Sequence, residues 1–98
     1  MSQESRALQA AAEHAQSFLA GLGDRRVAPV DPTDELRRKL QRPLPEAPTD
    51  AVRVINDLVA DASGGIMSTQ GGRFFSWVIG GSVPSAMAAD WMTTAWDQ

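Results

Sequence analysis

The residues that could take part in chemistry are few and lie far apart in the sequence. His14, the only histidine, stands between Glu13 and Ala15 in an alanine-rich stretch, where a helix surface is its expected place. Lys39, the only lysine, follows two arginines, so we expect a solvated, protonated amine rather than a Schiff-base nucleophile. With no cysteine and no clustered histidine or carboxylate ligands, the sequence predicts no metal site.

Three glycine pairs, at 64–65, 71–72 and 80–81, raise the question of a phosphate-binding loop. Neither the Gly-x-x-x-x-Gly-Lys-Ser/Thr motif nor the Gly-x-Gly-x-x-Gly motif occurs. Gly80-Gly81-Ser82 precedes a predicted helix and could contact an anion there, but a simple turn from strand to helix is the favoured interpretation. Taken residue by residue, the chain holds no self-sufficient active site.

Composition narrows the class of protein. Ninety-eight residues allow one small domain, and the net charge of −3 with nine scattered basic residues argues against a nucleic-acid surface. No apolar run approaches the roughly 20 residues of a membrane span, and the N-terminus lacks the apolar core of a signal peptide. We therefore expect a cytoplasmic protein with neither nucleic acid nor membrane as partner.

Apolar spacing predicts a mostly α-helical chain. The first helix is expected over 3–22, with Gly23 as its left-handed end, and a short second helix after a cap at Asp31 or Thr33. Prolines at 43, 45 and 48 form a stiff linker to a third helix, which is capped by Thr49 or Asp50 and ends at the glycine pair 64–65. Its buried stripe is expected to consist of Val52, Ile55, Val59 and Ala62. A short strand is expected over 74–79.

The final helix is predicted from Pro84 to Gln98 and is apolar over much of its surface. Its apolar side chains form two adjacent rows, Met87, Trp91 and Ala95 in one and Ala88, Met92 and Trp96 in the other. Such a helix is expected to be covered on several sides, by further chain or by a second subunit. Because it reaches Gln98 without a stop signal, we expect the chain to be the truncated front of a longer protein.

Six landmarks follow one another along the chain: Phe18-Leu19, Arg26-Val27-Ala28-Pro29, Asp31-Pro32-Thr33-Asp34-Glu35-Leu36, Leu44-Pro45 with Ile55-Asn56-Asp57, Arg73-Phe74-Phe75-Ser76-Trp77 and Pro84-Ser85-Ala86-Met87-Ala88-Ala89-Asp90-Trp91. In this order they resemble the N-terminal region of the group II pyridoxal-phosphate-dependent decarboxylases, the family of aromatic-amino-acid, histidine and glutamate decarboxylases and their bacterial relatives. Gly71-Gly72 stands where the family commonly has a proline, and Gly80-Gly81 where the aromatic-amino-acid enzymes carry a polar residue, which suggests a divergent bacterial branch.

The resemblance implies the N-terminal helical segment of a type I pyridoxal-phosphate enzyme, whose parent fold is α/β. It implies a homodimer formed through the N-terminal helices, an amino acid as substrate, and decarboxylation at its α-carbon. It also implies packing roles in a core or interface for Phe74 and Phe75. The implied wall of the substrate pocket consists of Trp77, Val78, Ile79 and Gly80.

The family's Schiff-base lysine and the other residues that hold pyridoxal 5'-phosphate follow later in the chain. The resemblance thus implies no catalytic, cofactor-binding or metal-binding residue here, and a segment that is inactive alone. Residues 1–48 would form a helical arm with a proline-rich linker, and residues 49–98 an incomplete start of the decarboxylase domain, with helix, short strand and helix. The alternatives are a stand-alone small helical interaction protein and an inactive subunit that docks on a complete homologue.

Overall fold

The computed structural model describes residues 1–77 and 79–98, and within them the chain is mostly helical, as predicted. The described residues form no strand. No helix among them is long and apolar enough to cross a lipid bilayer. The elements are α1 (Gln3–Ala20), α2 (Thr33–Leu40), α3 (Ala51–Ala62), a 3-10 turn η1 (Ser63–Gly65) and α4 (Pro84–Trp96).

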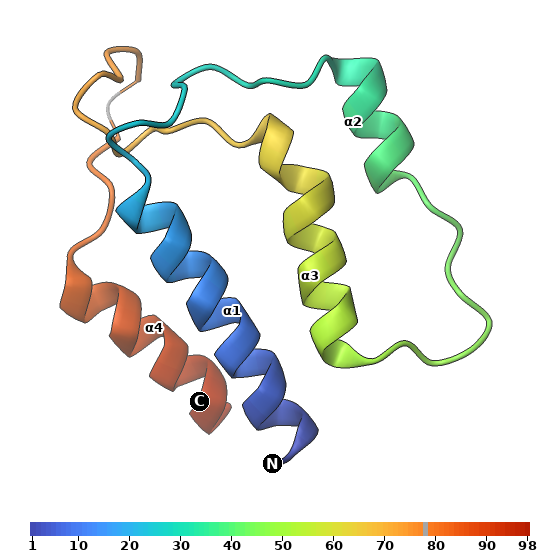
Figure 1. Cartoon of the computed structure of the whole chain (residues 1–98). Helices are drawn as coiled ribbons and strands as arrows, with labels where there is room; N and C mark the ends of the chain where they lie inside the picture. Colours follow the sequence, from blue (N-terminus) through green and yellow to red (C-terminus); the bar gives the residue numbers. More distant parts are fainter. Residues whose placement is uncertain (78) are drawn as a thin grey trace.

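The helices lie side by side with α1 between α3 and α4, and α2 flanks the far side of α3 (Figure 1). Helix α1 meets α3 through a half-buried stripe that matches the predicted spacing of three and four residues. On α3 that stripe contains the four positions expected from sequence, Val52, Ile55, Val59 and Ala62, and all four are half-buried.

The beginnings of α3 and α4 follow the predicted chemistry, but the side-chain cap predicted for α2 at Asp31 or Thr33 is wrong, because Pro32 is its N-cap and no side chain caps the helix. The Asp50 carboxylate accepts a hydrogen bond from the Arg53 amide at 3.4 Å and caps α3, and proline opens α4 at position 84. The end of α1 was predicted wrongly. The helix stops at Ala20 rather than at residue 22, with Gly21 as its cap at φ −90°, and Gly23 is not left-handed.

The expectation that the last helix lacks an ending is also wrong. Helix α4 ends at Trp96, and Asp97 takes the left-handed conformation at φ 59° that commonly closes a helix. Its amide donates to the Thr94 carbonyl at 3.2 Å, and the Gln98 amide donates to the Thr93 carbonyl at 3.4 Å. An aspartate supplies the turn that glycine or asparagine usually supplies, which is why the sequence pattern missed it.

The strand predicted over 74–79 does not form in the described residues of that range. The Phe74 amide donates to the Gly71 carbonyl at 3.2 Å, and the Ile79 amide donates to the Trp77 carbonyl at 3.1 Å. These bonds close local turns. A strand needs a neighbour to receive its backbone hydrogen bonds, and the described residues provide none.

The helices enclose no apolar core among the described residues, because no hydrophobic side chain there is fully buried. The chain exposes 7647 Å², about 2,200 Å² more than the roughly 5,400 Å² expected of a folded monomer of 10.5 kDa. Its radius of gyration, 15.5 Å, also exceeds the roughly 12.6 Å expected for 98 residues. The chain therefore leaves apolar surface uncovered.

Candidate functional site

The segment expected to line a substrate pocket lies in the loop between η1 and α4. Trp77 is 63% exposed, Ile79 is 44% exposed, and Gly80 is exposed as well. Val78 lies outside the described residues. The rings of Phe74 and Trp77 pack edge to face, with their centres 5.7 Å apart and their planes at 62°. The described side chains of this segment thus project from the surface.

The two phenylalanines before this segment differ in environment. Phe74 is half-buried, whereas Phe75 is 89% exposed. Of the two packing roles that the resemblance implied, a core within this chain is therefore wrong for Phe75. An interface role is left as a proposal.

The base of the loop is held by polar contacts to the segment that follows α1. The Ser68 hydroxyl donates to the Arg26 carbonyl at 3.1 Å, and the Ser68 amide donates to the Val27 carbonyl at 3.2 Å. The Arg73 guanidinium donates to the carbonyls of Gly23 and Arg25, at 3.0 and 2.8 Å. With 1% of its surface exposed, Ser68 is the only fully buried residue in the described part of the chain. The base of the loop is therefore held by hydrogen bonds, while the Trp77 side chain on the loop is exposed.

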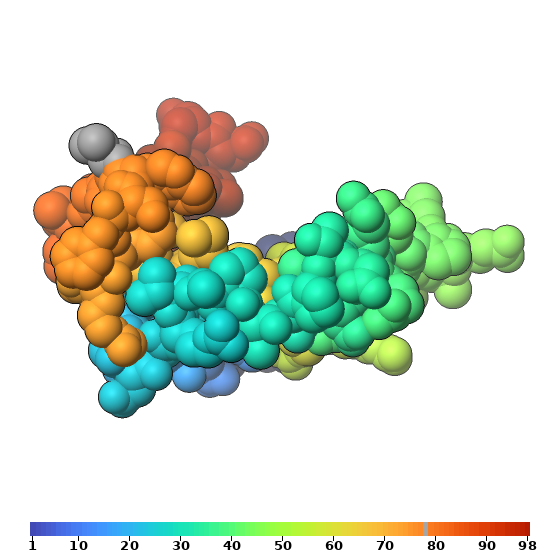
Figure 2. All heavy atoms as spheres, turned by 90° about the horizontal axis from the view of Figure 1, so that it is seen from above, coloured from blue at the N-terminus to red at the C-terminus, as the bar shows by residue number. Residues whose placement is uncertain are grey.

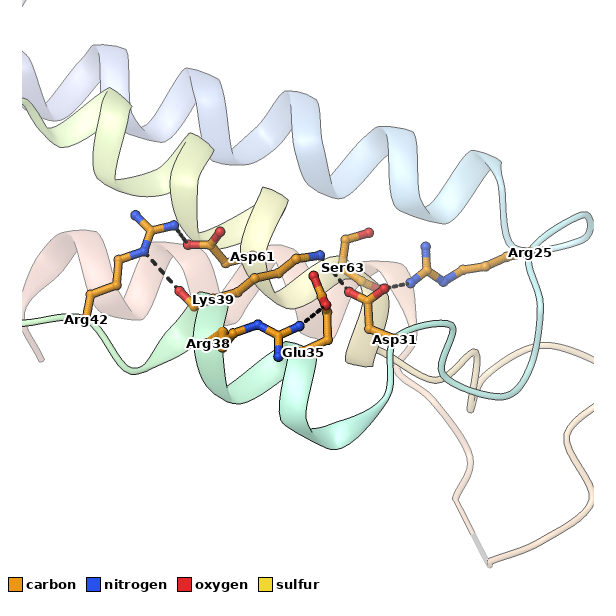
Figure 3. A network of polar contacts seen from close by, with 8 residues as sticks. All are labelled: Arg25, Asp31, Glu35, Arg38, Lys39, Arg42, Asp61 and Ser63. Atoms are coloured by element: carbon orange, nitrogen blue, oxygen red, sulfur yellow. Dashed lines mark hydrogen bonds and ion pairs between the residues drawn. The ribbon is translucent and has the colours of Figure 1, made fainter.

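Arg25 joins the ends of α1 and α3. Its guanidinium donates to the Ser63 carbonyl at 2.7 Å (Figure 3). It also donates to the Ile66 carbonyl at 3.2 Å and lies 5.1 Å from the centre of the Phe18 ring. A cation near the carbonyl end of a helix is favoured by the helix dipole. Sequence analysis missed this role, because the carbonyls that Arg25 contacts lie about 40 residues away in the chain.

Two apolar clefts flank α1. The cleft towards α3 has a volume of about 560 Å³ and is lined by Phe18, Ile55 and Val59 among others. The cleft towards α4 has a volume of about 520 Å³, with Leu19 and Trp91 among its lining. Both have the size of small-molecule sites, but their walls offer few groups that could orient a reacting ligand. They are better suited to accept apolar side chains.

His14 points towards α3. Its Nε2 atom lies 2.7 Å from the Asn56 side-chain oxygen, so the ring links the two helices. The structure thus gives the half-buried His14 a packing role between helices rather than a place on an open surface. Among residues 1–77 and 79–98, no cluster of histidine and acidic residues could hold a metal ion.

Lys39 is poorly suited to form a Schiff base with the aldehyde of a cofactor. Its Nζ atom lies 2.8 Å from the Asp31 carboxylate (Figure 3), and this hydrogen bond raises the pKa of the Lys39 amine above its ordinary value. A Schiff-base lysine must instead lose its proton readily. The described residues therefore do not fit pyridoxal phosphate.

Comparison of the chain with protein-family models, curated proteins and solved structures finds no match. The landmark order is therefore the ground on which a family can be proposed.

Proposed function

We propose that this chain is the N-terminal part of a pyridoxal-phosphate-dependent amino-acid decarboxylase, a carbon–carbon lyase. In this role it contributes a dimer interface and part of a substrate-pocket wall. The catalytic and cofactor-binding residues belong to the remainder of the enzyme. Trp77, Val78, Ile79 and Gly80 form the proposed wall, reaching towards the substrate across the interface, and the cytoplasm is the proposed location.

The uncovered apolar surface is the structural observation that supports the interface role in this proposal. Met92 and Trp96 on α4 are 44% and 62% exposed, and Leu19 on α1 is 38% exposed. Obligate homodimers bury roughly 2,000–5,000 Å² in total, so part of the excess of about 2,200 Å² exposed by each copy is enough to form such an interface. The interface we propose comprises the open side of α1 and α4, including the cleft between them that Leu19 and Met92 line.

The loop geometry supports a role at a shared site. Arg73 and Ser68 hold the base of the loop, while Trp77 projects from it. A side chain that orients a ligand must be held by its surroundings, and an aromatic ring can form an apolar pocket wall. The loop has the fixed base, and a second copy would supply the opposite wall.

The native gene product tests this proposal. An antibody raised against residues 1–98 should detect a polypeptide longer than 98 residues. That polypeptide should carry pyridoxal phosphate, visible by its absorbance, and release CO₂ from an amino acid in a screen of candidate substrates. Recovery of a 98-residue product with no pyridoxal-phosphate protein bound to it would contradict the proposal.

A stand-alone interaction protein or an inactive docking subunit would use the same open helix faces. The docking subunit predicts recovery of the short product together with a complete decarboxylase. The stand-alone protein predicts the short product with a partner that binds no cofactor. Mass spectrometry of the material captured by the antibody separates the three.

A further inference from the structure

The linker between α2 and α3 projects from the body of the chain. Every residue from 41 to 50 is exposed, and Leu44 is 92% exposed. Figure 2 shows this green segment extending beyond the helices. Its sequence is Arg42-Pro43-Leu44-Pro45-Glu46-Ala47-Pro48, in which a cation precedes two pairs of apolar residue and proline.

The spacing suits a polyproline II helix, which has three residues per turn. In that conformation Arg42, Pro45 and Pro48 fall on one edge, because they are three residues apart. Leu44 and Ala47 fall on a second edge. The third edge carries Pro43 and Glu46, positions that point away from the other two. One face thus combines a cation with both apolar–proline pairs.

We propose that the linker is a docking peptide for a protein domain that binds polyproline II helices. Such a domain offers an aromatic-lined groove for the Leu44-Pro45 and Ala47-Pro48 pairs, and an acidic pocket beside it for Arg42. Proline-rich peptides suit this use because proline limits the conformations that are lost on binding; here the bend at Glu46 and Ala47 must straighten when the partner binds. The inference is independent of the proposed enzyme function, since it uses no residue of the dimer face or of the pocket wall.

The free chain holds the arginine of this motif against α3. The Arg42 guanidinium contacts the Asp61 carboxylate, and its Nε donates to the Lys39 carbonyl at 2.9 Å (Figure 3). A second carboxylate, on Asp57, lies 3.9 Å away. On docking, Arg42 leaves the Asp61 carboxylate and pairs with an acidic residue of the partner domain. The ion pair with Asp61 therefore competes with docking, and its removal should strengthen binding.

A titration tests the proposal directly. The probe is a recombinant SH3 domain that prefers ligands with arginine on the N-terminal side of the prolines, added to the ¹⁵N-labelled 98-residue chain. Amide shifts should change within residues 41–50 and not in α1 or α4. Pro45→Ala with Pro48→Ala should weaken binding about tenfold or more. Pro43→Ala, the same substitution on the outward edge, is the matched control and should leave the affinity nearly unchanged.

The variant Asp61→Asn should change the binding affinity in a way that is not expected if the linker only connects α2 to α3. It should raise the affinity about two- to fivefold, the range expected when an ion pair with one exposed partner, Arg42, is released. Arg42→Gln should weaken binding both alone and in combination with Asp61→Asn. Circular dichroism checks that helix content is kept in each variant. No binding by the wild-type chain, or equal losses for Pro43→Ala and the Pro45/Pro48 double variant, would overturn the proposal.

Discussion

Replacement of Trp96 by alanine tests whether the open face of α4 is a dimer interface. Trp96 is 62% exposed, and buried aromatic side chains cover about 150–250 Å² each, so about 150 Å² of its surface is available for a partner. At about 25 cal/mol per Å², burial of that area stabilises a dimer by up to about 4 kcal/mol per copy. Alanine keeps part of the area, so we expect a loss of about 2–3 kcal/mol per copy.

Because both copies carry the substitution, the total loss is about 4–6 kcal/mol, and the dimer dissociation constant should rise about a thousandfold or more. Sedimentation equilibrium over a range of concentrations measures this constant. The control is Leu44→Ala, which removes a more exposed apolar side chain (92% exposed) in the linker, away from α1 and α4. Equal constants for Trp96→Ala and the wild type, or a wild-type chain that stays monomeric throughout, would refute the reasoning.

Three further predictions concern the body of the chain. Gly64→Ala should lower the free energy of unfolding by about 1–3 kcal/mol in urea denaturation, because the added carbon would clash with the Asp31 carboxylate. An unchanged midpoint would contradict this. Because the pKa of Lys39 is raised in the folded state, its contact with Asp31 stabilises the fold below the ordinary lysine pKa and is lost as the pH rises through the folded-state value. Above about pH 10.4 the wild type should therefore lose more stability than Lys39→Gln. Parallel curves of stability against pH for the two proteins would argue otherwise. A double-mutant cycle of His14→Ala and Asn56→Ala should give a coupling free energy of about 0.5–1.5 kcal/mol, and strict additivity would show that the contact contributes nothing.

Local rules predicted the helices well where the sequence carries its own signal. Asp50 as the cap of α3, proline 84 as the start of α4 and the half-buried stripe of α3 all follow from short-range chemistry. The errors arise where an element depends on a distant part of the chain, or where an uncommon residue type performs a local role. The apolar run after Arg73 resembles a strand, but the described chain gives it no neighbour, and Asp97 closes α4 without the glycine that the pattern seeks.

The candidate site was predictable only in part. Sequence reasoning marked Trp77 and its neighbours through the resemblance, and their role in substrate binding stays a prediction. It did not find Arg25 or Ser68, whose partners lie about 40 residues away in the chain. Contacts of a side chain with distant backbone carbonyls leave no periodic trace in a sequence, because any residue offers the same carbonyl group.

The polar junction explains how the described helices keep their arrangement without an apolar core. Arg25 ties the end of α1 to the end of α3, while Ser68 and Arg73 tie the following loop to the same place. These bonds lie where the helices end, so they leave the apolar clefts along α1 open. Hydrogen bonds from the charged guanidinium groups of Arg25 and Arg73 contribute about 1.5–3 kcal/mol each, and the neutral bond from Ser68 about 0.5–1.5 kcal/mol. Burial of one large apolar side chain contributes a similar amount, about 1.5–3 kcal/mol. The few bonds of the junction can therefore set the directions of the helices, but the exposed apolar side chains are more numerous, and most of the free energy available to this fold lies in the faces that a partner would cover.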